Sequence, residues 1–132
     1  MSIKDAGVEV SRWSLVRLEL APTVGFPKGS PSRFYLLRLP LFRDGAIDIA
    51  ALLATPRNAT VRRFWPNEPD RSGYIIRNDV GWAFSYPFGE VAENDLFEAI
   101  QQDIRPGGEL RIFERDGSDM LYRIKSVLPE MS

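Results

Sequence analysis

Hydrophobic and polar residues alternate along much of the chain, which is the pattern of half-buried strands. In the first such run Val16, Leu18 and Leu20 fall on one side and charged residues fall on the other. The runs with this period are predicted to be strands and cover 13–21, 33–41, 60–65, 73–78 and 81–86. The first two are expected to form a hairpin across the loop 23–32, and the other three a meander.

A helix signal interrupts the alternation after the second strand. Asp48 is a good N-cap, Ile47 and Leu52 have the spacing of a hydrophobic staple, and Pro56 follows the apolar run. We therefore predict a short helix over 49–54.

A second helix is predicted over 93–104. Asn94 is suited to cap it, and the apolar residues fall on one helical stripe formed by Leu96, Phe97, Ile100 and Ile104. The stretch contains several acids and no basic residue, so it is expected to present an acidic surface.

The last part of the chain, 108–128, reads as a hairpin, with Leu110 and Ile112 expected opposite Tyr122 and Ile124. The predicted order is ββαβββαββ. We therefore expect one domain over 1–132, with 1–8 as a loose N-terminal tail. Its class is mainly β (α+β): a small antiparallel β-barrel or strongly curved sheet of about seven strands with two short helices.

The chain has neither histidine nor cysteine. This excludes Ser-His-Asp and Cys-His triads, disulfides and the usual zinc sites. We expect no cofactor and no metal, and an enzyme is disfavoured. The apolar runs are too short to span a membrane, and the N-terminus does not look like a secretory signal, so a cytoplasmic location is expected.

The net charge of −1 hides two oppositely charged halves. Residues 1–66 carry ten basic side chains against five acidic ones, whereas residues 67–132 carry seven against thirteen. We expect the two halves to interleave their charges in the fold. The alternative is a basic face that binds an anionic partner.

The segment 61–73 (VRRFWPNEPDRSG) is the first candidate binding element, because its two prolines stiffen a loop rich in charged and aromatic side chains. We prefer the alternative, a prolyl turn between strands in which Arg62, Arg63 and Arg71 pair with Glu68, Asp70 or the acidic helix. Mixed charge and apolar character on both faces indicates that 60–65 is not a central strand. The candidate residues of this segment are Arg62, Arg63, Trp65, Glu68, Asp70 and Arg71.

Trp82, Phe84 and Tyr86 are the second candidate element, since alternate positions on a strand share a face. They fit either a stacking platform or, as we prefer, the core.

These features favour a non-catalytic module that binds another protein, through 61–73 or the acidic helix 93–104, or a small ligand. Pairing of 60–65 with a second copy would give a homodimer. The first alternative is a single-stranded nucleic-acid-binding barrel, which the sequence pI of about 5.5 disfavours. The second is a carboxylate enzyme or small-ligand pocket that uses Glu68 and Asp70.

Overall fold

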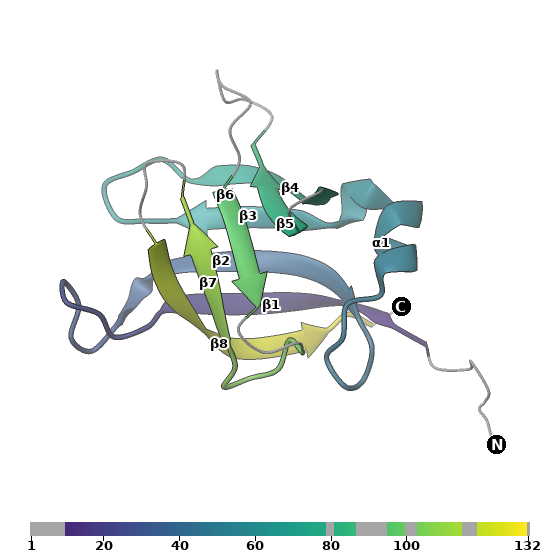
Figure 1. Cartoon of the computed structure of the whole chain (residues 1–132), viewed down its shortest axis with the longest axis horizontal. Helices are drawn as coiled ribbons and strands as arrows, with labels where there is room; N and C mark the ends of the chain where they lie inside the picture. Colours follow the sequence, from purple (N-terminus) through teal and green to yellow (C-terminus); the bar gives the residue numbers. More distant parts are fainter. Residues whose placement is uncertain (1–9, 79–80, 87–94, 100–102, 115–118, 132) are drawn as a thin grey trace.

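A computed structural model describes residues 10–78, 81–86, 95–99, 103–114 and 119–131. Within these residues the chain forms eight strands, one short helix and one 3-10 turn (Figure 1). The strands are β1 (Arg12–Leu20), β2 (Ser30–Leu41), β3 (Thr60–Phe64), β4 (Arg71–Asn78), β5 (Gly81–Ser85), β6 (Asp95–Ala99), β7 (Glu109–Phe113) and β8 (Asp119–Pro129). The helix α1 spans Ile49–Ala54, and the 3-10 turn η1 spans Pro56–Asn58.

The described strands form one curled antiparallel sheet in which each strand pairs with the next along the chain. β1 also pairs with β8, with Val16 opposite Val127, so the sheet closes into a barrel. Closure pairs the outer strands of the sheet, which would otherwise present unpaired backbone groups. The predicted mainly β, antiparallel and strongly curved fold is confirmed.

The core lies inside the barrel and follows the alternation of the strands. The inward positions of β1 and β2 are 5% exposed or less and comprise Val16, Leu18, Leu20, Tyr35, Leu37, Leu39 and Leu41. Each fully buried aliphatic side chain stabilises the fold by about 1.5–3 kcal/mol. The hydrophobic side predicted for the first strand therefore faces the core, and the predicted hairpin is confirmed.

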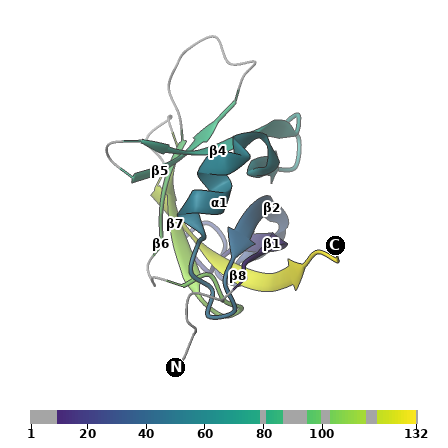
Figure 2. The same ribbon diagram turned by 90° about the vertical axis from the view of Figure 1, so that its right-hand side faces the viewer.

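Helix α1 lies across one end of the barrel (Figure 2). The side chain of Asp48 accepts a hydrogen bond from the backbone N–H of Ala51 at 3.0 Å, as expected of an N-cap. Leu52 is 1% exposed and belongs to the core. The first predicted helix is confirmed with its cap.

The second predicted helix is wrong where the structure describes it, because residues 95–99 form strand β6. β6 pairs with β5 on one side and with β7 on the other. Two neighbouring strands thus supply its backbone with partners, and this tertiary pairing outweighs local helix preference. The remainder of the predicted helix, apart from 103–104, lies outside the described residues, as does the predicted tail 1–8.

Three smaller predictions are also corrected. β2 starts at Ser30, so it takes in the end of the predicted loop 23–32. β3 is paired on both sides, by β2 and β4, so 60–65 is not an edge. Leu110 does lie opposite Tyr122, but Ile112 lies opposite Met120, because partners on antiparallel strands run in opposite directions along the chain.

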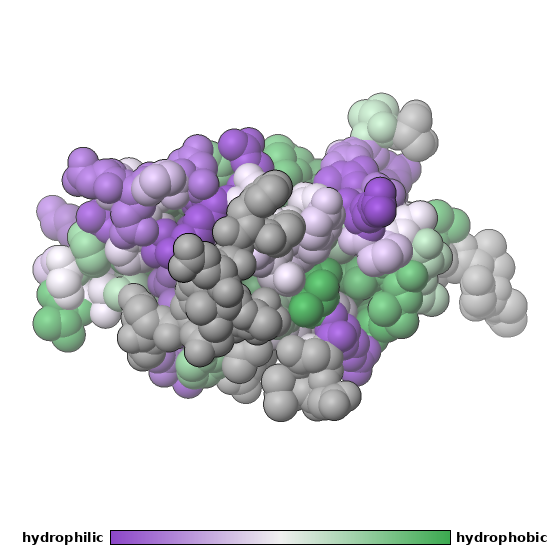
Figure 3. Space-filling model, turned by 90° about the horizontal axis from the view of Figure 1, so that it is seen from above, coloured by the Kyte–Doolittle hydropathy of each residue, from purple (hydrophilic) through white to green (hydrophobic). Residues whose placement is uncertain are grey.

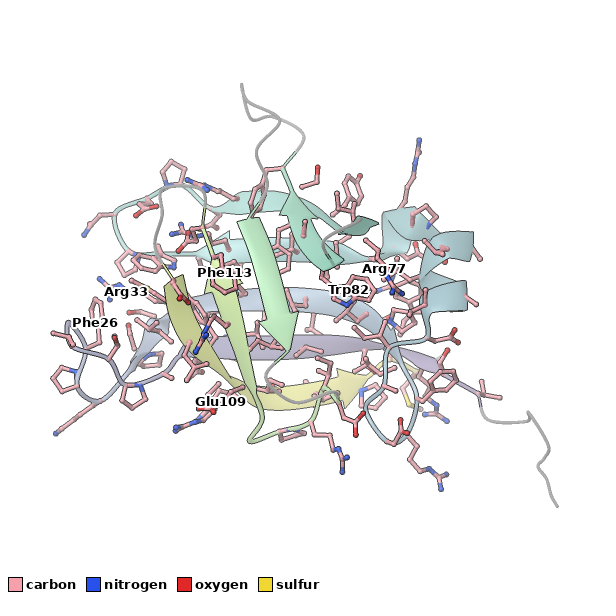
Figure 4. The ribbon with its side chains drawn as sticks, viewed as in Figure 1. Phe26, Arg33, Arg77, Trp82, Glu109 and Phe113 are labelled. Carbon is pink, nitrogen blue, oxygen red and sulfur yellow. The ribbon has the colours of Figure 1, made fainter. Side chains whose placement is uncertain are left out.

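The connections β1–β2 and β3–β4 lie together at the end of the barrel away from α1, which we call the loop end (Figure 1). Arg33 and Phe26 lie at this end, and Arg77 and Trp82 lie near α1 (Figure 4). In each pair the guanidinium lies over the ring, at 4.2 Å and 5.6 Å from the ring centroid.

Candidate functional site

The two adjacent arginines of the first candidate element point to opposite sides of the barrel wall. Arg63 is 4% exposed and lies on the inner side, in line with the buried Val61. Arg62 is exposed on the outer side. Only Arg62 is therefore open to a partner.

Arg63 is held by two carboxylates near the loop end. Its NH1 donates to Oε1 of Glu68 at 3.0 Å, and its NH2 lies 2.9 Å from Oε1 of Glu114. The side chain of Glu114 is 6% exposed and that of Glu68 is 44% exposed. The guanidinium also lies 4.6 Å from the ring centroid of Trp65. This arrangement matches the prediction that an arginine of 61–73 pairs with Glu68.

Two buried tyrosines lie beside Arg63. Tyr35 is its neighbour across β2 and β3, and the ring of Tyr122 meets that of Tyr35 edge to face at 5.0 Å. Burial raises the pKa of both phenols above the ordinary value, and the charge of Glu114 adds to the rise. Burial alone would lower the pKa of Arg63, but Tyr35 and the two carboxylates raise it overall. The phenols thus stay neutral while the guanidinium stays charged.

The sequence interpretation missed Glu114, Tyr35 and Tyr122 as neighbours of Arg63. A signal was present for Glu114, because it continues the inward positions Leu110 and Ile112 by one further step. A buried acid at such a position requires a buried cation as partner.

The three aromatic residues of the second candidate element, Trp82, Phe84 and Tyr86, differ in how deeply they are buried. Phe84 is fully buried, with its ring 5.4 Å from that of Tyr35, as the preferred core interpretation expects. Trp82 and Tyr86 are partly buried and pack against the core. Arg77 covers Trp82, and Arg71 lies 5.7 Å from the ring centroid of Tyr86. The three aromatics therefore do not form an open platform.

The acid pair suggested for a carboxylate enzyme, Glu68 and Asp70, has its first member engaged in an ion pair. Glu68 is bound to Arg63, and Asp70 is exposed in the β3–β4 connection. Among the described residues no group of three or more acidic side chains is placed to hold a metal ion.

A basic surface covers the outside of β8, β1, β2 and β3. We call it the outer basic face. Its cations are Arg17, Lys28, Arg38, Arg62, Arg123 and Lys125, and its acids are Glu19, Asp119 and Glu130. Glu109 of β7 borders it beside Arg123. Six positive charges against three negative ones leave the face basic.

All three acids of this face are already bound. Asp119 lies 3.4 Å from Nε of Arg111 in β7. Nε of Arg17 lies 2.7 Å from Oε2 of Glu19. Arg38 donates to both carboxylate oxygens of Glu130, from Nε and from NH2, at 2.6 Å each. These bonds raise the pKa of Arg38 and lower that of Glu130. The other four cations remain without an ion pair to a described residue.

A stacked column of side chains crosses the centre of this face. The rings of Phe34 and Phe64 stack at 4.6 Å with an interplanar angle of 15°. Arg17 lies 3.8 Å from the centroid of Phe34, and Arg62 lies 4.8 Å from that of Phe64. Stacking fixes both guanidinium groups on the face and leaves the N–H edge of Arg62 open to an acceptor.

The rest of the surface is more mixed. Seen from above, hydrophilic side chains cover much of the loop end, and hydrophobic patches lie mainly in the half that carries α1 (Figure 3). Ile49 and Leu53 of α1 are 37% and 62% exposed. These two side chains are one helical turn apart on the same face, and an exposed apolar pair of this size is normal on folded proteins.

No helix in the described part of the chain has the length and apolar character needed to cross a membrane. Comparison of the chain with protein-family models, with curated proteins and with solved structures finds no match.

Proposed function

We propose that the protein is a non-catalytic interaction module that binds an acidic segment of a partner protein on its outer basic face. The observation that carries this proposal is the charge of the face, which holds six cations against the three bound carboxylates of Glu19, Asp119 and Glu130. Such a surface attracts negative charge and accelerates association with an acidic partner.

The composition of the face favours a protein over a nucleic acid. Leu15 and Leu128 lie opposite each other on it and are 38% and 59% exposed, so apolar and basic surface lie side by side. Aromatic side chains and arginine are the residues enriched at protein interfaces. The ring faces of Phe34 and Phe64 are covered by each other and by guanidinium groups, so bases find no free ring to stack on.

A binding titration tests the proposal with a fluorescent oligoglutamate peptide and a fluorescent oligothymidylate as probes. We expect the oligoglutamate to bind more tightly than the oligothymidylate, with an affinity that falls as salt is added. The variant Arg62→Glu should weaken oligoglutamate binding by about threefold to tenfold, because it reverses an exposed, unpaired charge of the face.

The matched control is Arg57→Glu, which reverses an exposed arginine of η1, outside the face. It should leave the affinity unchanged. Tighter binding of the oligothymidylate would support the nucleic-acid alternative and overturn the proposal. Failure of both probes to bind at low salt, or equal losses in the two variants, would overturn it as well.

A further inference from the structure

A pocket of about 310 Å³ opens at one side of the outer basic face. It lies where β1, β8 and the β1–β2 connection meet, and basic side chains from two of these segments line it: Lys28, Arg123 and Lys125. The pocket is also lined by Glu19, Ser30 and Pro31. This volume is at the lower end of the range for small-ligand sites.

The three cations of the pocket have no bonding partner among the described residues. None of them forms a hydrogen bond, an ion pair or a ring contact with another described residue. The one acid of the pocket, Glu19, is bound to Arg17 at 2.7 Å. Three positive charges and one negative charge give the pocket lining a net charge of about +2, before Arg17 is counted.

The backbone brings the three cations together by two local irregularities. Arg17 pairs with Ser126 and Leu18 pairs with Ile124, so Lys125 is the extra residue of a β-bulge. In the β1–β2 connection, Gly29 adopts φ of 75°, and a Cβ at this position would lie 2.5 Å from the carbonyl oxygen of Leu20. This close approach folds the connection back towards the end of β1. Lys28, the residue before Gly29, therefore lines the same pocket as Arg123.

We infer that this pocket binds a phosphate monoester, carried on a phosphorylated side chain of the acidic partner. A phosphate monoester carries about −1.5 to −2 charges at pH 7, which matches the charge of the lining. The guanidinium of Arg123 offers paired donors to phosphate oxygens, and the two lysines offer compact positive charges. The inference rests on the proposed function, because the pocket belongs to the outer basic face.

The test compares three probes by isothermal titration. The first is an acidic peptide with one central phosphoserine, the second is the same peptide with serine, and the third is inorganic phosphate. We expect the phosphoserine peptide to bind at least about tenfold more tightly than the serine peptide, because phosphate adds charge-assisted hydrogen bonds. Inorganic phosphate should bind more weakly than the phosphoserine peptide, since it lacks the acidic residues that contact the rest of the face.

The double variant Lys28→Ala/Arg123→Ala should reduce the preference for the phosphoserine peptide to about twofold or less. The control Arg62→Ala lies outside the pocket and should weaken both peptides by a similar factor. Both double-variant residues are exposed, and an unchanged thermal midpoint of unfolding checks that the fold is kept.

The outcomes separate the two proposals. Equal binding of the two peptides to the unmodified protein, with a loss in Arg62→Ala, would overturn the phosphate inference and leave the proposed function standing. No binding of either peptide would overturn both. Inorganic phosphate that binds as tightly as the phosphoserine peptide would overturn the phosphorylated partner in favour of free phosphate.

Discussion

Arg62 and Arg63 are neighbours in sequence with opposite surroundings, because successive side chains on a strand point to opposite faces. Alternation correctly places Arg63 with Val61 on one side of β3. It does not reveal that this side is the interior, since a charged residue is rarely buried without a partner. The partner Glu114 comes from β7–β8, a distant part of the chain, and only the closed sheet brings it to Arg63. Local sequence patterns do not predict which two residues so far apart along the chain will be in contact.

Gly29 provides a residue-scale test of how the β1–β2 connection is held. Substitution Gly29→Ala should lower the free energy of unfolding by about 1–3 kcal/mol, because it strains a residue with φ of 75° and drives a methyl group against the Leu20 carbonyl. Urea denaturation followed by tryptophan fluorescence measures the change.

Gly25 is the matched control in the same connection. A Cβ built there meets no other atom within 4 Å, so Gly25→Ala should change the free energy of unfolding by less than about 0.5 kcal/mol. Equal losses in the two variants would contradict the specific role given to Gly29.

At the scale of elements, secondary structure was predicted correctly where the local sequence pattern and the tertiary packing favour the same element. β1 from Ser14 to Leu20 and β2 from Tyr35 to Leu39 alternate between buried and less buried positions, and α1 has both its cap and its buried Leu52. β6 is the exception. Its five residues sit in a stretch with a helical stripe, but β5 and β7 flank it and supply backbone partners. The local pattern of apolar residues contains no information on which strands lie on either side of this segment. The helix prediction was therefore wrong.

The substitution Glu98→Thr tests the assignment of β6. Threonine has a lower helix propensity and a higher strand propensity than glutamate. In a strand the free energy of unfolding should stay level or rise, by up to about 1 kcal/mol. Urea denaturation measures the change against the unmodified protein.

The control is Ala50→Thr, at an exposed position of α1. In this true helix threonine should cost up to about 0.7 kcal/mol relative to alanine. A loss of similar size in Glu98→Thr would contradict the strand.

At the scale of the whole molecule, the two halves of the chain do interleave their charges, as expected. Arg38 and Arg63 belong to the basic half, and their acids Glu68, Glu114 and Glu130 belong to the acidic half. Interleaving is incomplete, however, because Arg62 and Lys28 have no acidic partner in the part that the structure describes. The barrel thus combines interleaved charges with an outer face that stays basic.

The buried phenols of Tyr35 and Tyr122 predict how the whole barrel responds to alkaline pH. Their pKa values are raised by burial in the folded state, whereas phenols of the unfolded chain ionise near pH ~10. The folded state therefore keeps protons that the unfolded chain releases. The contribution of each group is complete below pH ~10 and is lost as pH rises above it, at up to about 1.4 kcal/mol per pH unit.

The variant Tyr122→Phe isolates one of these two groups. Its free energy of unfolding should fall less steeply between pH ~10 and ~12 than that of the unmodified protein, by up to about 1.4 kcal/mol per pH unit. Chemical denaturation at a series of pH values gives both slopes. Equal slopes would contradict the neutral, buried state of Tyr122.

The pairing of β1 with β8 also sets the order in which the barrel can assemble. The other strand pairs join neighbours along the chain and close much shorter segments, of which 42–59 between β2 and β3 is the longest, whereas Ser14 and Pro129 come together across almost the full length of the protein. Long loops close at a higher entropic cost and slow the folding of β proteins. Pairing of β1 with β8 is therefore the step whose entropic cost is reduced most when the other strand pairs have already formed. A circular permutant that joins β8 to β1 would convert this long-range pairing into one more local hairpin.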